Sequence, residues 1–170
     1  GTGVIGINGG GITEHHELEA KAYSSNLILI ATLSKALGAQ GGAVLCASPI
    51  RDYLINYAKS FIYTTGLNPV STAAALESVR ILKQSNDLVS ELQKRTKRAH
   101  GLLHQAGLEL LDSKTAIIPV LTKTETRAIE FADLLREKGL LVSAIRPPTV
   151  PKGTSRLRFV VNASIEDEDF

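Results

Sequence analysis

The feature that most constrains this chain is a lysine-centred turn that directly follows an apolar run. Residues 27–31 are all apolar, and the next residues, 32–42, read Thr-Leu-Ser-Lys-Ala-Leu-Gly-Ala-Gln-Gly-Gly. A short apolar run bounded by glycine and polar residues is typical of a buried strand, so Lys35 is expected in a small, hydroxyl-rich turn. Lysine is the usual imine-forming residue, because a desolvated ammonium group readily releases its proton. Taken alone, the pattern fits a surface lysine on a loop better than a Schiff-base lysine, so the second reading depends on agreement from other segments.

Two further segments follow in the same chain. Residues 61–65 read Phe-Ile-Tyr-Thr-Thr, and residues 144–158 contain Arg-Pro-Pro-Thr-Val-Pro-Lys-Gly-Thr-Ser-Arg-Leu-Arg from Arg146 to Arg158. With the lysine motif, and in this order, they resemble the α-oxoamine synthases, a family of pyridoxal-phosphate (PLP) enzymes. Within that family the Arg-Pro-Pro-Thr-Val-Pro run is most similar to the biotin-pathway branch. The resemblance extends over essentially the whole chain.

The resemblance implies an α/β fold of the aspartate-aminotransferase type, known as PLP fold type I. The chain corresponds to roughly the C-terminal half of the family's chain. It is expected to be a fragment, with the end of the large PLP-binding domain in residues 1–80. Residues 81–170 would form a connecting helix and a small C-terminal α/β domain, incomplete at its end.

The hydrophobic pattern predicts the main elements independently of the family. Strands are expected at residues 27–31 and 42–47, a helix from Pro49 with Ser48 as its N-cap, and an extended segment at 61–63. A long helical pattern runs from Pro69 to about Ala106, with a weak point at 84–87. After Gly107 the pattern predicts strand 116–121, helix 126–138, strand 140–145 and strand 156–161.

The cofactor residues come from the resemblance, with Lys35 as the residue bound to PLP and as the proton carrier at the substrate α-carbon. The family assigns the cofactor phosphate to the threonine that matches Thr32, and Ser34 is a weaker candidate beside it. Thr64 and Thr65 read by themselves as ordinary hydroxyls at a strand end. In the family this segment crosses a dimer interface and reaches the phosphate of the neighbouring subunit, which implies a homodimer with shared sites.

The substrate residues lie near the end of the chain. Arg158 and Arg156 share one face if their strand is regular, and without the family they would read as a solvated surface. By resemblance Arg158 binds the amino-acid carboxylate, for which a planar guanidinium is well suited. Thr149 matches a residue that the family uses near the substrate, whereas the roles of Arg146 and Arg156 stay open.

The implied function is that of a PLP-dependent acyltransferase. It condenses L-alanine with a pimeloyl thioester, carried on coenzyme A or acyl carrier protein, with loss of CO2. The alternatives are another oxoamine synthase that uses glycine or serine, and a noncatalytic truncated or degenerate member of the fold. The family keeps a ring-stacking histidine and a pyridine-facing aspartate in an earlier segment, so residues 1–170 alone are expected to be inactive.

Other patterns point to no further chemistry. The formal net charge of +2 gives no case for nucleic acid, and no apolar run approaches the roughly 20 residues needed to span a bilayer. Gly1–Gly6 spells a dinucleotide-binding motif but lacks the strand and helix that give it meaning. His100 and His104 have helical i, i+4 spacing without an obvious third metal ligand, so no metal is expected. The single Cys46 fits a reducing, cytoplasmic compartment.

Overall fold

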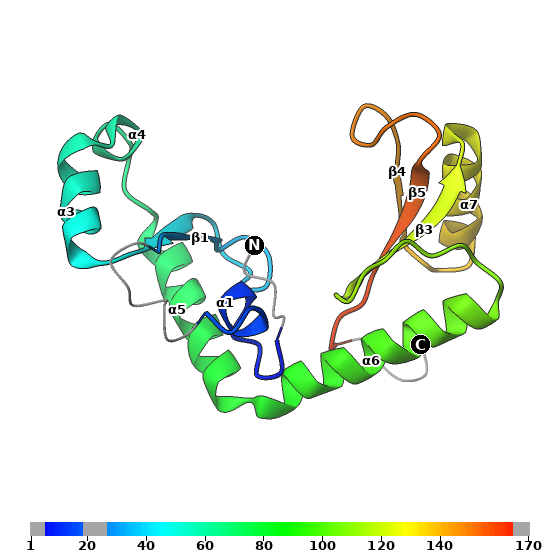
Figure 1. Ribbon diagram of the computed structural model, residues 1–170, viewed down its shortest axis with the longest axis horizontal. Coiled ribbons are helices and arrows are strands. Elements are labelled where there is room, and N and C mark those ends of the chain that lie inside the picture. Colours follow the sequence, from blue (N-terminus) through cyan, green and yellow to red (C-terminus); the bar gives the residue numbers. More distant parts are fainter. Residues whose placement is uncertain (1–5, 19–26, 165–170) are drawn as a thin grey trace. The chain divides into compact units, whose positions relative to one another are not determined.

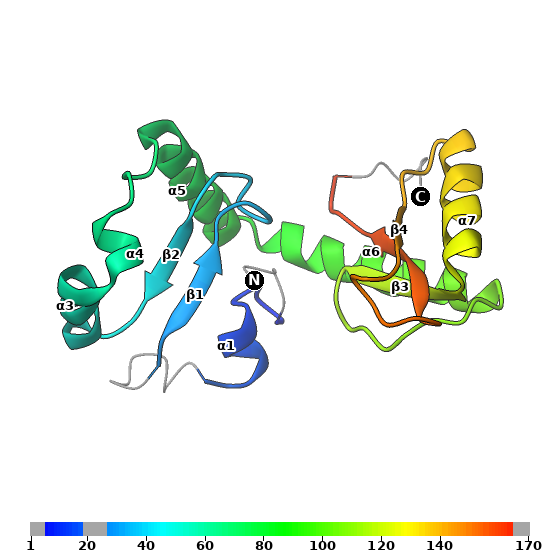
Figure 2. The same ribbon diagram turned by 90° about the horizontal axis from the view of Figure 1, so that it is seen from above.

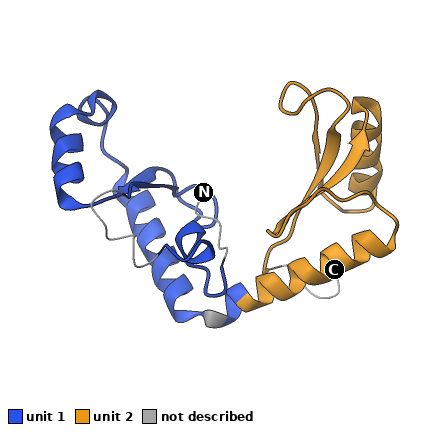
Figure 3. Cartoon of the chain, viewed as in Figure 1, with its two compact units in different colours: residues 1–89 blue, residues 90–170 orange. Residues whose placement is uncertain are grey.

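The computed structural model describes residues 6–18 and 27–164. The chain divides into two compact units, which are unit 1, residues 1–89, and unit 2, residues 90–170 (Figure 3). The boundary falls inside helix α6, Asn86–Gln105. The sequence pattern placed the domain boundary earlier, near residue 80.

The core of unit 1 is a β-hairpin that presents the lysine turn. Strands β1, Leu29–Thr32, and β2, Gly42–Leu45, pair antiparallel, with Leu29 opposite Leu45 and Thr32 opposite Gly42 (Figure 2). Both predicted strands are therefore confirmed. The expectation that they are buried is wrong for the described residues, since Ile30 is 79% exposed. A two-stranded ribbon has no covering layer of its own and cannot bury both faces.

Among its described residues, unit 1 also contains three helices of ten residues or fewer. They are α1, Ile12–His15; α3, Ser48–Tyr57; and α4, Lys59–Ile62 (Figure 1). Pro49 lies in the first turn of α3 as expected, but the N-cap is Ala47, which offers no side-chain hydrogen bond. The extended segment predicted at 61–63 is wrong, because the amides of Phe61 and Ile62 both donate to the carbonyl of Ala58 at 2.9 Å. That single turn is too short to show a helical period in the sequence.

The long helical pattern forms two helices with a break at the predicted weak point. Helix α5 spans Pro69–Gln84, and α6 begins at Asn86. Ser85 between them has φ −112° and ψ 76°, outside the helical region. Asn68 caps α5, because its side-chain oxygen accepts a hydrogen bond from the Val70 amide at 2.8 Å.

Unit 2 is a small α/β layer with its own core. Its antiparallel sheet has the order β3-β5-β4, from strands Ile117–Lys123, Ser155–Val160 and Ser143–Ile145. Helix α7, Glu125–Glu137, covers one face of this sheet (Figure 1). Side chains from both layers form the buried cluster, which consists of Val120, Ala132, Val142 and Leu157. The predicted strand–helix–strand–strand order is confirmed.

Candidate functional site

The predicted cofactor lysine lies in the loop that joins β1 to β2. Backbone hydrogen bonds close this loop, from Leu33 to Gly41 at 2.9 Å, from Ala39 to Leu33 at 2.8 Å and from Gly38 to Lys35 at 2.9 Å. Gly38 and Gly41 have positive φ values of 59° and 123°, a region that glycine adopts at no steric cost. The loop is therefore a defined turn and holds Lys35 at its tip.

The base of the loop is buried, whereas Lys35 itself is exposed. Leu37 and Ala39 are 7% and 8% exposed, and the Leu37 carbonyl accepts a hydrogen bond from Ser78 Oγ of α5 at 2.9 Å. These contacts fasten the loop to α5. The desolvation that the sequence suggested for Lys35 is absent among the described residues, because no second layer covers this side of the hairpin.

Two hydroxyl residues come shortly before the lysine in the chain. Thr32 Oγ1 and Ser34 Oγ lie 3.2 Å apart, within hydrogen-bond distance. Hydroxyl groups can donate to phosphate oxygens, and the Lys35 amine can form an imine with an aldehyde. An amine next to a pair of hydroxyls is a donor set that fits a phosphorylated aldehyde such as PLP. The structure places Thr32 and Ser34 in hydrogen-bond contact and Lys35 next to Ser34 in the same loop.

The predicted threonine pair follows α4 in the same unit. Thr64 and Thr65 are both exposed. Two residues further on, Leu67 approaches the lysine loop so closely that a Cβ on Gly41 would lie 2.7 Å from Leu67 Cδ2. Glycine is therefore favoured at position 41 by its backbone conformation, and a larger residue there would also displace the end of the Leu67 side chain. The packing fixes the segment after the threonines against the loop that carries Lys35.

The predicted substrate residues lie in unit 2. Arg158 is exposed on β5, opposite Pro119 of β3 and Ser143 of β4. Arg156 lies two residues earlier on the same strand, and the regular pairing confirms that the two arginines share a face. Thr149 is exposed in the loop before β5, and its amide donates to the Arg146 carbonyl at 3.0 Å.

Sequence reasoning missed the residue that organises the glycine-rich segment before the lysine motif. The Glu14 carboxylate accepts hydrogen bonds from the Asn8 amide at 2.8 Å, from Asn8 Nδ2 at 2.9 Å and from the Gly10 amide at 2.7 Å. These bonds, that of the Asn8 amide foremost, lower the pKa of Glu14. An acidic residue in the first helical turn after a glycine run was the available signal.

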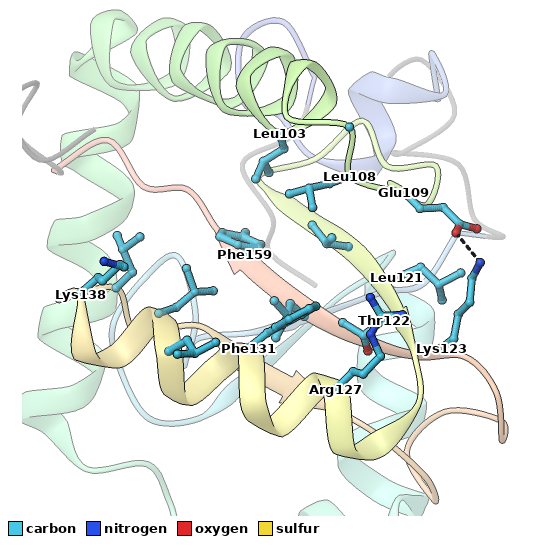
Figure 4. A pocket seen from close by; sticks show the side chains of 16 residues that line it. Leu103, Leu108, Glu109, Leu121, Thr122, Lys123, Arg127, Phe131, Lys138 and Phe159 are labelled. Carbon is cyan, nitrogen blue, oxygen red and sulfur yellow. Dashed lines mark ion pairs between the residues drawn. The ribbon is translucent and has the colours of Figure 1, made fainter.

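A cavity of about 670 Å³ lies within unit 2, among α7, β3, β5 and the end of α6 (Figure 4). Its walls are mainly aliphatic and aromatic, with Leu103, Leu108, Phe131 and Phe159 among them. Lys123 lines it too, but its amine is paired with Glu109 at 3.0 Å. None of the predicted site residues lines this cavity.

The described part of the chain offers no other recognisable centre. Within residues 6–18 and 27–164, no group of three or more His, Cys, Asp or Glu side chains is arranged to hold a metal ion. His100 and His104 both lie on α6. A search of the described residues also finds no helix with the length and apolar character needed to cross a membrane.

Comparison with known proteins gives consistent matches along the chain. The family profile described as aminotransferase class I and II matches residues 6–170. An 8-amino-7-oxononanoate synthase from Petrotoga mobilis is 40% identical over 100% of this chain and 43% of its own length. An 8-amino-7-oxononanoate synthase from Pseudomonas fluorescens is 38% identical over 96% of this chain and 41% of its own length. The chain thus spans less than half the length of these curated relatives.

Solved structures match at the level of the fold. A serine palmitoyltransferase from Sphingomonas wittichii has a TM-score of 0.88 at 29% identity, over 99% of this chain and 42% of its own. An 8-amino-7-oxononanoate synthase from Francisella tularensis has a TM-score of 0.82 at 30% identity, over 97% of this chain and 48% of its own. A structure of SPT with the PLP internal aldimine has a TM-score of 0.89 at 27% identity.

Proposed function

Because the chain belongs to the class I and II aminotransferase family and has the fold of PLP fold type I enzymes, we propose that it serves a PLP-dependent acyl transfer. The proposed reaction condenses L-alanine with a pimeloyl thioester to give 8-amino-7-oxononanoate. The names of the curated relatives support this choice of substrates. The observation that carries the proposal is the closed β1–β2 loop with Lys35 at its tip and the paired Thr32 and Ser34 hydroxyls beside it.

The lysine and the hydroxyl groups divide the task of holding the cofactor. Lys35 would bind the aldehyde carbon of PLP, and Thr32 and Ser34 would donate hydrogen bonds to its phosphate. Thr64 and Thr65 would add further donors to a phosphate. When bound, PLP supplies an electron sink for a carbanion at the amino-acid α-carbon.

The remaining roles belong to the protein's own groups. The Lys35 amine takes the α-proton of L-alanine and returns a proton to that carbon after condensation. Arg158 holds the alanine carboxylate through parallel hydrogen bonds, and Thr149 contacts the substrate. In the balance of the reaction one carbon–carbon bond forms at the acyl carbonyl. The carbon–sulfur bond breaks to release the thiol, and the carboxylate leaves as CO2.

The test is turnover by the complete protein with defined substrate pairs. L-alanine, glycine and L-serine would each be offered with pimeloyl, succinyl, acetyl and palmitoyl thioesters, on coenzyme A and on acyl carrier protein. We expect the highest kcat/KM for L-alanine with a pimeloyl thioester, with equal release of CO2, thiol and 8-amino-7-oxononanoate. Preference for serine with the palmitoyl thioester, or for glycine with a short one, would overturn this assignment.

We also propose that the protein acts as a homodimer with shared sites, in the cytoplasm. Residues 61–70 support the dimer, because all of them are exposed and they include Tyr63, which is 83% exposed. Such a run can bury apolar surface against a second copy. A Lys35→Ala protein mixed with a Thr64→Val, Thr65→Val protein should regain about a quarter of wild-type activity if dimers reassort randomly. Failure to regain activity would contradict shared sites.

A further inference from the structure

The face of the unit 2 sheet that carries Arg158 carries a second arginine. Arg156 and Arg158 lie two residues apart on β5, so their Cα atoms are about 7 Å apart and their side chains leave the same face. Directly opposite residues in an antiparallel pair also share a face. Arg156 is flanked by Leu121 on β3 and Ile145 on β4. The two cross-strand neighbours of Arg156 are therefore apolar, and neither is a carboxylate.

Arg156 is held in place by the backbone of the loop before it. Its Nε donates to the Thr154 carbonyl at 2.9 Å. Thr154 is fixed in turn, since its amide and its Oγ1 donate to the Pro151 carbonyl at 3.2 and 2.7 Å. A guanidinium has five N–H donors, so this tether uses one and leaves the two terminal nitrogens for a ligand.

Neither arginine is neutralised by the protein around it. Among residues 6–18 and 27–164, no ion pair involves Arg156 or Arg158. Arg156 is half-buried and Arg158 is exposed. Two guanidinium groups without an ion pair, of which Arg156 lies between apolar cross-strand neighbours, form a binding face for a molecule that has two anionic groups joined by an aliphatic chain.

We infer that Arg156 binds the carboxylate at the far end of the acyl donor, while Arg158 binds the carboxylate of the amino acid. This inference rests on the proposed function, in which the acyl donor is a thioester of a dicarboxylic acid. It adds a specificity-determining residue to that reaction. The apolar side chains of Leu121 and Ile145 beside Arg156 suit the methylene chain that leads to the distal carboxylate.

The test compares pimeloyl thioester with heptanoyl thioester, which has the same chain length and ends in a methyl group. In the complete protein, Arg156→Gln should raise KM for the pimeloyl thioester roughly tenfold to a hundredfold, the range for losing a hydrogen-bonded charge. KM for the heptanoyl thioester and for L-alanine should stay within about twofold. Arg156→Lys keeps the charge and should recover part of the loss.

Arg136→Gln is the matched control, because Arg136 is an exposed arginine of the same unit that pairs with Asp133 on α7. It should change none of these constants. An equal rise in KM for both thioesters, or a rise for L-alanine alone, would overturn the role of Arg156.

A binding measurement separates this inference from the proposed function. Calorimetric titration of the complete protein with pimelate and with heptanoate requires no turnover. Wild type should bind pimelate more tightly than heptanoate, and Arg156→Gln should abolish that difference. If alanine and pimeloyl thioester fail to react, the proposed function falls, and the titration still decides whether Arg156 recognises a dicarboxylate. Equal pimelate affinity of wild type and Arg156→Gln would refute it.

Discussion

The two units differ in how much of their apolar surface they bury themselves. Unit 2 buries apolar side chains from every strand of its sheet or the adjoining segments and from α7; these are Ile118, Val120, Ala128, Ala132, Val142, Leu157 and Val161. In unit 1 the buried apolar residues among those described are Leu37, Ala39, Ala75 and Val89. Two of those four hold the base of the lysine loop. Among the described residues, unit 1 therefore buries the base of its lysine loop but leaves the β1–β2 hairpin largely exposed, whereas unit 2 is organised around a core.

We expect the substitution that lowers activity most to lie in unit 1. In the complete protein, Lys35→Ala should lower kcat at least about a thousandfold, because in the proposed function one amine both holds the cofactor and transfers the proton. Its melting temperature should stay near that of wild type, since the Lys35 side chain is exposed. Lys83→Ala, an exposed lysine of α5, serves as the control and should keep full activity. Substantial turnover by the Lys35→Ala variant would contradict the proposal that the Lys35 amine of unit 1 carries the reaction.

The largest effect on stability should come from unit 2. Leu157 is 4% exposed in the buried cluster, so Leu157→Ala should lower the free energy of unfolding by about 3 kcal/mol. Ile30→Ala in β1 removes a largely exposed side chain and should cost less than about 0.5 kcal/mol. Chemical denaturation of both variants checks the contrast. Comparable losses of unfolding free energy in the two variants would show that the β1–β2 hairpin is covered in the complete protein. The two units would then differ less in how much apolar surface they bury.

The two units also differ at a helix N-cap, and substitutions there should change the free energy of unfolding by smaller amounts. In unit 2, Thr124 caps α7, with Oγ1 accepting from the Arg127 amide at 3.3 Å. In unit 1, the N-cap of α3 is Ala47, which makes no side-chain capping hydrogen bond. Thr124→Ala should therefore lower the free energy of unfolding by about 1 kcal/mol, whereas Ala47→Ser should raise it by about 0.5 kcal/mol. Denaturant midpoints measure both changes, and a loss of stability on Ala47→Ser would contradict this account of α3.

The smallest effect concerns the order of the glycine-rich segment in unit 1. Because the pKa of Glu14 is lowered in the folded chain, its carboxylate stabilises this segment above the unfolded pKa, and that stabilisation is lost as the pH falls through the folded pKa. Glu14→Gln should lower the hydrogen-exchange protection of the Asn8 and Gly10 amides at neutral pH, with the difference from wild type vanishing in acid. Unchanged protection at neutral pH would count against the Glu14 hydrogen bonds.

Much of the fold follows from patterns that are visible in single segments. The alternation around Leu157, the helical spacing after Thr124 and the break near Ser85 each depend on residues close together in the chain, so the sequence predicted them. The single turn of α4 is too short to show a period. The exposure of Ile30 depends on which other segments cover the hairpin, and this cannot be predicted from the residues next to Ile30 in the sequence.

The candidate site divides in the same way. Lys35, Thr32 and Ser34 lie within four residues, so their grouping could be read from the sequence, and the shared face of Arg156 and Arg158 follows from strand alternation. The tether from Arg156 to the Thr154 carbonyl and the Glu14 hydrogen bonds depend on backbone geometry in loops. Those contacts became visible only in three dimensions.

The measurement that tests the account most directly is the site of PLP attachment in the complete protein. The protein would be incubated with PLP, reduced with borohydride, digested and analysed by mass spectrometry. We predict a phosphopyridoxyl group on the peptide that contains Lys35, and no such label on that peptide in Lys35→Ala. A label on another lysine, with Lys35 unmodified in the wild-type protein, would contradict the account.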